Sequence, residues 1–187
     1  PFLTNAAILH GIKFEDMAVK IYEKQNNVKV NEFGCLPHST IPFFGASPDG
    51  IVSYDSENKN YVGRMLEIKC PKSRKITGII PDGYFAQIQG QLEVCDLEYC
   101  DFLECELREY DNKQQFFEDV HPHNYLLMKN GNEKGVIIEV YDKTLKKIIY
   151  FYNYDNFKTI EEFNIWEDKI IDDILENDNY EYNLTTF

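Results

Sequence analysis

The chain has 187 residues, of which 43% are hydrophobic and 14% aromatic, so it is long enough for one substantial core and is not a disordered or low-complexity protein. Its 19 Lys and Arg residues and 32 Asp and Glu residues give a formal net charge of −13, which argues against binding nucleic acid through a generally basic surface. No apolar stretch approaches the length of a membrane span and no signal peptide is recognisable. We therefore expect an intracellular, cytoplasmic protein without a membrane partner.

The cysteines also favour a reducing compartment. They are five in number, and no pair has the two-residue gap of a zinc ribbon or redox motif. We expect free thiols.

The first predicted element is a helix over residues 11–23, because Phe14, Ala18, Ile21 and Tyr22 fall on one face of a helix.

Short β-type runs follow at residues 41–46, 49–54 and 61–70. Residues 55–60 between the last two runs are polar and typical of a turn, so these runs are predicted to form an antiparallel hairpin.

A second helix is predicted over residues 83–94 and a strand over 99–107. Residues 111–132 are polar and irregular, which favours a long loop. Two further strands are expected at 135–141 and 145–152.

The last predicted element is an amphipathic helix with a stripe of Phe163, Trp166, Ile170 and Ile174. This order of elements predicts an α/β (α+β) fold in which helices flank a central mixed β-sheet. The absence of a linker rich in Pro, Gly or Ser predicts a single domain over residues 1–187.

Charged residues mark the predicted hairpin. Asp49 enters one of its strands, while Glu67 and Lys69 lie two residues apart on the other, so their side chains share a face. Carboxylates beside a lysine indicate a site for a hard cation such as Mg²⁺ or Mn²⁺. The chemistry that needs this set is metal-assisted hydrolysis of a phosphodiester, in which the lysine orients water or stabilises developing charge.

The second predicted helix presents a polar face formed by Tyr84, Gln87 and Gln91. No Lys, Arg, Asp or Glu occurs in residues 83–92, which favours a face turned toward a site over a solvated one.

Together these motifs resemble a known family. Pro48-Asp49 followed by Glu67-X-Lys69 is the core pattern of the PD-(D/E)XK nucleases, which implies a restriction-endonuclease-like core. The surrounding motifs resemble the phage lambda exonuclease type, the YqaJ viral recombinase family, from residue 11 to about residue 106. They are Gly11-X-X-X-Glu15, Gly45-X-Ser47-Pro48-Asp49-Gly50, Glu67-Ile68-Lys69-Cys70-Pro71 and Tyr84-X-X-Gln87-X-Gln89.

The resemblance implies roles for individual residues. Metal ligands would be Asp49, Glu67, the main-chain carbonyl of Ile68 and Glu15, the last of these through water or directly. Lys69 would be the catalytic lysine and Gln87 would position it or the nucleophile, with Tyr84 and Gln89 in support. For DNA binding we expect Ser47 and the segment of Lys72, Ser73, Arg74 and Lys75.

The resemblance also implies an activity and partners. Family members degrade one strand of duplex DNA from a 5′ end and leave a 3′ single strand for recombination. This implies an Mg²⁺-dependent exonuclease, with Mn²⁺ as a substitute and one or two ions, that acts on double-stranded DNA ends. Partners would be a single-strand annealing protein and further copies of the chain in a ring-shaped trimer. Abundant Asn, Ile, Tyr and Lys are typical of an AT-rich genome and favour a large DNA virus or phage.

One departure and three alternatives stay open. The Arg and Ser/Thr with which family members bind a 5′-phosphate are not found before residue 11, so we expect that an N-terminal helical segment is lacking or that no 5′-phosphate is required. The alternatives are another PD-(D/E)XK endonuclease, a helicase-associated nuclease and a catalytically silent DNA-binding module.

The net charge is unevenly distributed. Residues 64–75 hold five basic residues and one acid, a net +4, whereas residues 161–181 hold nine acids and one lysine, a net −8. We therefore expect weak, salt-sensitive DNA binding through the basic segment.

Overall fold

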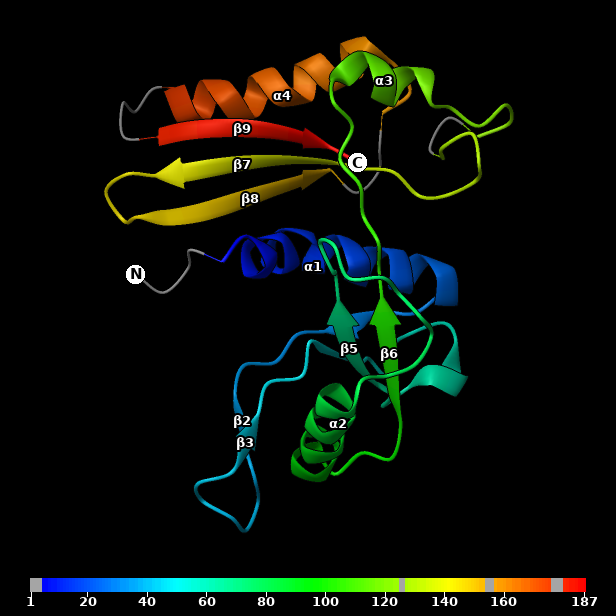
Figure 1. Cartoon of the computed structure of the whole chain (residues 1–187), viewed down its shortest axis with the longest axis vertical. Helices are drawn as coiled ribbons and strands as arrows, with labels where there is room; N and C mark the ends of the chain where they lie inside the picture. Colours follow the sequence, from blue (N-terminus) through cyan, green and yellow to red (C-terminus); the bar gives the residue numbers. More distant parts are fainter. Residues whose placement is uncertain (1–4, 125–126, 154–156, 176–179) are drawn as a thin grey trace. The chain divides into compact units, whose positions relative to one another are not determined.

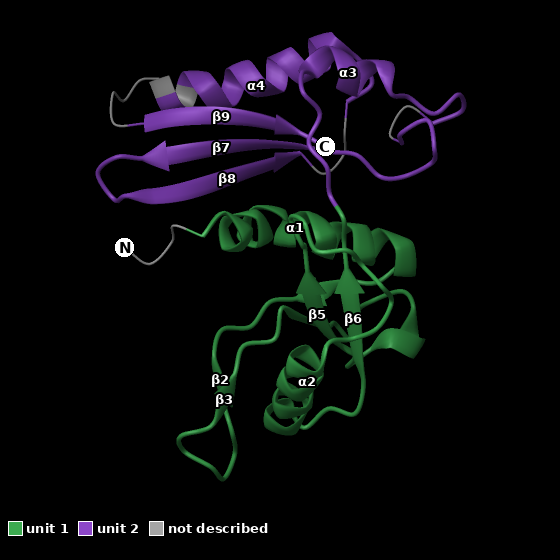
Figure 2. Cartoon of the chain, in the orientation of Figure 1, with its two compact units in different colours: residues 1–106 green, residues 107–187 purple. Residues whose placement is uncertain are grey.

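The chain forms two compact units, Pro1–Glu106 and Leu107–Phe187 (Figure 2). The computed structural model describes residues 5–124, 127–153, 157–175 and 180–187. The single domain expected over residues 1–187 stays a prediction.

The first unit begins with helix α1, Ala6–Asn26 (Figure 1). The side chain of Asn5 accepts a hydrogen bond from the N–H of Ala7 at 2.9 Å and caps the helix, so it starts five residues before the predicted bound. Asn27 ends it in the left-handed conformation.

A four-stranded sheet forms the centre of the first unit. Its order is β1-β4-β5-β6, with β4 antiparallel to both β1 and β5, and β6 parallel to β5. The predicted antiparallel hairpin and mixed sheet are thus confirmed. The bounds are Val30–Asn31 for β1, Gly50–Val52 for β4, Met65–Lys69 for β5 and Cys100–Glu104 for β6.

The four predicted strands of this unit are all shorter in the structure, and two of them, at 41–46 and 61–70, are shortened by turns. Of the run at 41–46, only β3, Gly45–Ala46, is a strand, paired with β2, Leu36–Pro37. The preceding residues form a turn, in which the N–H of Phe44 donates a hydrogen bond to the carbonyl of Ile41. The run at 61–70 is shortened by a 3₁₀ turn, η1, at Lys59–Tyr61 and by Gly63, whose φ of 77° interrupts an extended chain.

Helix α2, Asp82–Cys95, connects the parallel strands β5 and β6 and confirms the predicted second helix. Figure 1 shows α2 beside these strands and α1 running across them. Strand β5 is buried along most of its length, with Met65 and Leu66 fully buried. A strand packed on both faces has a fixed backbone, which makes it a rigid platform for the charged residues that it also carries.

The second unit is an antiparallel sheet of order β8-β7-β9 with an apolar core shared with α4. Two residues of the predicted stripe join residues of β7 in the core: Phe163 lies in one cluster with Val136, and Ile174 in another with Ile138 and Val140. The bounds are Lys113–Glu118 for α3, Val136–Asp142 for β7, Lys147–Asn153 for β8, Ile160–Leu175 for α4 and Tyr180–Thr186 for β9.

Two predictions for this unit were wrong. The segment 111–132 contains the short helix α3, whose Asn112 caps the N–H of Gln115 and whose Phe116 is buried. The chain does not close with α4, because β9 follows and pairs with β7. The fold class itself, helices around a mixed sheet, is confirmed.

All five cysteines are free. Within the part of the chain that the structure describes, no helix combines the length and hydrophobicity needed to cross a membrane.

Candidate active site

Strand β5 places a carboxylate inside the protein. Glu67 is 0% exposed, and its Oε1 accepts hydrogen bonds from the ammonium of Lys69 and, at 2.8 Å, from Nε2 of Gln87. Its Oε2 is buried and has no hydrogen-bond partner among the described residues. A buried carboxylate with an unpartnered oxygen is costly for folding, so its presence calls for a functional explanation.

Asp49 lies directly before β4 and next to β5. Its Oδ2 accepts a hydrogen bond of 2.6 Å from the N–H of Ile68, which fixes the carboxyl group to the strand that carries Glu67. Burial raises the pKa of Asp49, and the charge of Glu67 adds to this rise, while the Ile68 N–H and Lys69 oppose it.

The turn that presents Asp49 needs the glycine that follows it. A Cβ on Gly50 would lie 2.2 Å from Cγ1 of Val30 on β1, so a larger residue would push β1 and β4 apart.

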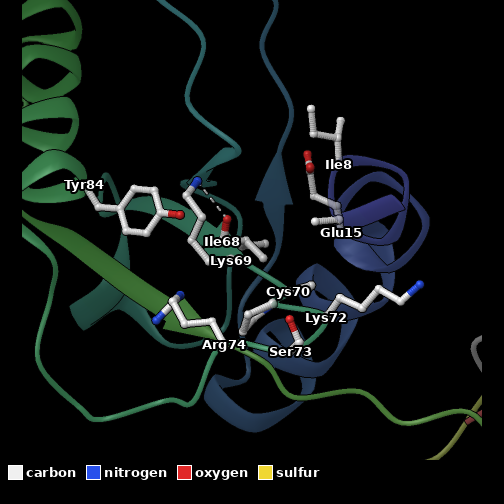
Figure 3. Close-up of a pocket in the computed structure, with 12 residues that line it drawn as sticks. Ile8, Glu15, Ile68, Lys69, Cys70, Lys72, Ser73, Arg74 and Tyr84 are labelled. Carbon is white, nitrogen blue, oxygen red and sulfur yellow. Dashed lines mark hydrogen bonds between the residues drawn. The ribbon is translucent and has the colours of Figure 1, made fainter. Parts of the chain in front are cut away.

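Glu15 reaches the same place from α1. It lines a pocket of about 480 Å³ together with Ile68 and Lys69 (Figure 3). Burial, followed by repulsion from Asp49 and Asp16, raises the pKa of Glu15 to about 7. The structure thus gathers Glu15, which only the family resemblance had indicated, with the motif residues.

Helix α2 turns its predicted polar face toward the site. Besides the bond from Gln87 to Glu67, Nε2 of Gln91 donates to the carbonyl of Ser47 at 3.3 Å. The ring of Tyr84 has its centroid 5.1 Å from Nζ of Lys69. Gln89 is exposed, and no hydrogen bond joins it to these residues in the described part of the chain.

The segment after β5 borders the pocket. Lys72, Ser73 and Arg74 line it, as Figure 3 shows, whereas Lys75 is exposed and is not part of its lining. Ser47 lies in a neighbouring cavity of about 210 Å³ that Glu15 and Asp49 also line. The structure therefore brings most of the predicted DNA-binding residues to the edges of one site.

The basic segment is less positive than its sequence indicates. Arg64 forms a 2.7 Å ion pair with Asp101, and Arg74 forms one with Glu104. Both acids lie on β6, and sequence reasoning did not select them. The signal that could have found them is the pair of carboxylates on either side of Phe102 and Leu103, along a strand predicted to lie in the sheet.

The described residues include no group of three or more His, Cys, Asp or Glu side chains arranged as metal ligands. Around Glu67 the positive charge is the ammonium of Lys69, which bonds to Glu67 and, at 3.1 Å, to the carbonyl of Ile68. These are two of the groups that the family resemblance assigns to a metal.

The comparisons with known proteins agree with the motifs. A model of the YqaJ-like viral recombinase domain matches residues 1–98. The chain is similar to an uncharacterised protein of Acanthamoeba polyphaga mimivirus, with 42% identity over 156 residues, which is 78% of this chain and 28% of that protein.

Two solved structures of an alkaline exonuclease from Laribacter hongkongensis are also similar. The protein alone is 33% identical with a TM-score of 0.47, over 57% of this chain and 54% of the other. The complex with dAMP is 31% identical with a TM-score of 0.47, over 58% and 54%. The chain thus spans about half of the solved relatives and less than a third of the mimivirus protein.

Proposed function

Because the chain belongs to the YqaJ-like viral recombinase family, we propose that it is a metal-dependent DNA exonuclease that acts on the ends of linear double-stranded DNA. The proposed reaction is hydrolysis of phosphodiester bonds in the 5′→3′ direction. It leaves a 3′ single strand for recombination, repair or viral replication, on which a single-strand annealing protein would act.

The observation that carries this proposal is the surrounding of Glu67. A fully buried carboxylate is held by Lys69 and Gln87, and Asp49 is fixed beside it by the N–H of Ile68. Packing alone would be served better by an apolar side chain at this position of β5. Clusters of perturbed carboxylates beside a lysine are typical of catalytic sites.

The donor set fits a hard divalent cation. Oε2 of Glu67 is buried without a partner among the described residues. Burial raises the pKa of Glu15, with repulsion from Asp49 adding to the rise, and burial raises the pKa of Asp49, with the charge of Glu67 adding to it. A cation bound here would give Oε2 of Glu67 a partner and would stabilise the charged forms of Glu15 and Asp49. The carboxylates of Asp49 and Glu67 and the carbonyl of Ile68, with Glu15 directly or through water, would hold one or two Mg²⁺ ions, with Mn²⁺ as a substitute.

A metal held by these residues would supply Lewis-acid chemistry, which polarises a phosphodiester and makes water a better nucleophile at neutral pH. The side chains supply orientation and charge. Gln87 and the N–H of Ile68 fix the directions of Glu67 and Asp49, and the ammonium of Lys69 stabilises negative charge that develops on the phosphate. The ring of Tyr84 attracts this ammonium and limits its movement.

The DNA backbone would contact Lys72, Ser73 and Arg74 at the pocket, with Ser47 and Lys75 at its margins. This set is small for a protein of net charge −13. Closure of three chains into a ring around the duplex would supply the further contacts that processive digestion needs.

The test compares linear and covalently closed circular duplexes of one sequence in Mg²⁺, in Mn²⁺ and in EDTA. We expect digestion of the linear duplex only, no digestion in EDTA, and early release of label from the 5′ end. Cleavage of the circle would favour the endonuclease alternative. Absence of digestion with either metal would contradict the proposal.

A further inference from the structure

The segment between β5 and α2 carries the basic residues of the site, but it has no regular structure. Residues 70–81 are neither helix nor strand, and the side chains from Lys72 to Lys75 are exposed. A long cationic side chain on such a segment samples many rotamers and must lose that freedom before it binds a phosphate.

Arg74 differs from its neighbours because a buried acid holds it. Glu104 ends β6, its side chain is 7% exposed, and its Oε1 accepts a hydrogen bond from Nη2 of Arg74. In the parallel pair of strands Glu104 lies opposite Lys69, so both side chains stand on the same face of the sheet. The ammonium of Lys69 bonds instead to Glu67 and to the carbonyl of Ile68, and among the described residues Arg74 is the cation paired with Glu104.

A second contact orients the same guanidinium. Its Cζ lies 5.8 Å from the centroid of the Tyr84 ring, and that ring is 5.1 Å from Nζ of Lys69. Figure 3 shows Arg74 and Lys69 on the side of the pocket where Tyr84 lies. Arg74 and Tyr84 also line an adjoining cavity of about 360 Å³ together with Gln87. Arg74 therefore lies where the pocket and this cavity meet, at the border of the candidate site.

The ion pair leaves part of the guanidinium free to bind a ligand. A guanidinium has five N–H donors in a fixed fork, and the bond to Glu104 uses Nη2. Nε, Nη1 and the second hydrogen of Nη2 remain as donors, and Nη2 shares a planar edge with each of the other two nitrogens, a geometry that suits the oxygens of a phosphate.

We infer that Glu104 is a positioning residue, which holds Arg74 so that its guanidinium binds a backbone phosphate of the DNA strand beside Lys69. The inference rests on the proposed function, because the phosphate belongs to the proposed substrate. A positioning role predicts an effect on DNA binding opposite to the effect of charge alone. A carboxylate near DNA repels the backbone, so its neutralisation should strengthen binding, whereas loss of a positioning residue should weaken it.

The test uses the full chain with Glu104→Gln, Arg74→Gln and both changes together. Glu98→Gln is the matched control, because it removes one negative charge from an exposed position between α2 and β6. Steady-state rates on a linear duplex give kcat and KM, and fluorescence anisotropy in a Lys69→Ala background gives the Kd for the same duplex. Thermal melting of each variant monitors folding.

We expect Glu104→Gln to raise KM and Kd about three- to tenfold, which corresponds to the cost of immobilising one long side chain, with kcat little changed. The double variant should bind no more weakly than Arg74→Gln alone, and Glu98→Gln should bind like the native chain. Arg74→Lys, which keeps the charge without the fork, should weaken binding in the same direction and covers the case in which Arg74→Gln fails to fold.

Tighter or unchanged binding by Glu104→Gln would overturn the inference, as would additive effects in the double variant or a loss of kcat at constant KM. Failure of the proposed function is distinguishable. If the native chain digested no DNA but the coupling between Glu104 and Arg74 persisted in Kd, only the proposed nuclease activity would be contradicted.

Discussion

Gln87 on α2 donates a hydrogen bond of 2.8 Å from Nε2 to Oε1 of Glu67 on β5. The two residues are brought together because α2 connects the parallel strands β5 and β6 and lies beside them. The bond links the helix to the buried carboxylate. The direction in which Glu67 presents its unpartnered Oε2 therefore depends on α2.

Replacement of Gln87 by Ala is expected to lower kcat by about tenfold to a hundredfold, the usual effect of removing a group that orients a ligand. KM for DNA should change little, because Gln87 contacts the carboxylate rather than the basic segment. Steady-state digestion of a linear duplex measures both. Gln89→Ala is the matched control on the same helix, and an equal loss in that variant would show that the effect is a general weakening of α2.

Glu15 predicts a pH dependence of stability in EDTA. Its pKa is raised from 4.5 to about 7 in the folded chain, so the folded state binds a proton more tightly than the unfolded state. The sign follows from linkage: stability falls as pH rises from about 4.5 to about 7, and the full penalty is present above that range. Glu15→Gln removes this penalty and should be more stable than the native chain at pH 8.5 by about 1–2 kcal/mol, a value that allows for solvent screening of a partly exposed group.

Urea unfolding of both proteins at pH 4.5 and pH 8.5 measures this difference. The increase in the free energy of unfolding caused by Glu15→Gln should be small at pH 4.5 and large at pH 8.5. Glu98→Gln on the same unit serves as a control, because it removes one negative charge from an exposed position between α2 and β6. A gain that is equal at both pH values would contradict the account.

Divalent metal is expected to raise the melting temperature. A ligand that binds only the folded state at a concentration 100 times its Kd adds about 2.7 kcal/mol of stability. Asp49→Asn should lose most of this gain, because a carboxylate in the donor set becomes a neutral amide. Thermal unfolding with increasing Mg²⁺ and Mn²⁺ is the measurement, and an equal shift in the native and Asn variants would argue against metal binding at Asp49.

Reversal of Lys72, Arg74 and Lys75 to Glu is expected to weaken duplex binding and to reduce its dependence on salt. The slope of log K against log salt should fall by roughly one for each DNA phosphate that the variant no longer binds. A matched reversal of Lys143 and Lys146, on the turn between β7 and β8, and of Lys147, the first residue of β8, should leave the slope nearly unchanged. If the first triple variant kept native affinity, the segment would not be the DNA-binding surface.

The central elements of the first unit were predictable because each is encoded locally. The apolar face of α1 has helical spacing, and the polar turn at residues 55–60 separates two β-type runs, so the helix and the hairpin followed from pattern alone. Helix α2 was predicted within one residue at each end. Because the hairpin predicts a strand at Glu67 and Lys69, which are two residues apart, it also predicts that their side chains lie on the same face of the sheet.

The errors have physical causes. Helix α3 depends on the Asn112 cap and on the burial of Phe116 against Phe163, a contact with a residue far along the chain. Strand β9 carries Tyr180, Tyr182 and Leu184 at alternate positions, a signal that was present but short, and its pairing with β7 is another long-range contact. Sequence patterns do not report such partners until the fold brings them together.

The same distinction applies to the site. Asp49, Glu67 and Lys69 share a pattern that spacing reveals, whereas Glu15 was selected by resemblance alone and Glu104 was not selected. The role of Glu104 depends on the register in which β6 pairs with β5, which places it opposite Lys69. That register is a property of the folded sheet.

The most direct test of the account compares the native chain and Lys69→Ala on an end-labelled linear duplex in Mg²⁺. We predict that the native chain digests the duplex and that Lys69→Ala loses at least about a hundredfold in kcat, while it melts as a folded protein and still binds DNA. Lys59→Ala, at an exposed position whose ammonium bonds to the carbonyl of Tyr54, should keep native activity. Native-like digestion by Lys69→Ala, or none by the native chain in either Mg²⁺ or Mn²⁺, would contradict the central claim.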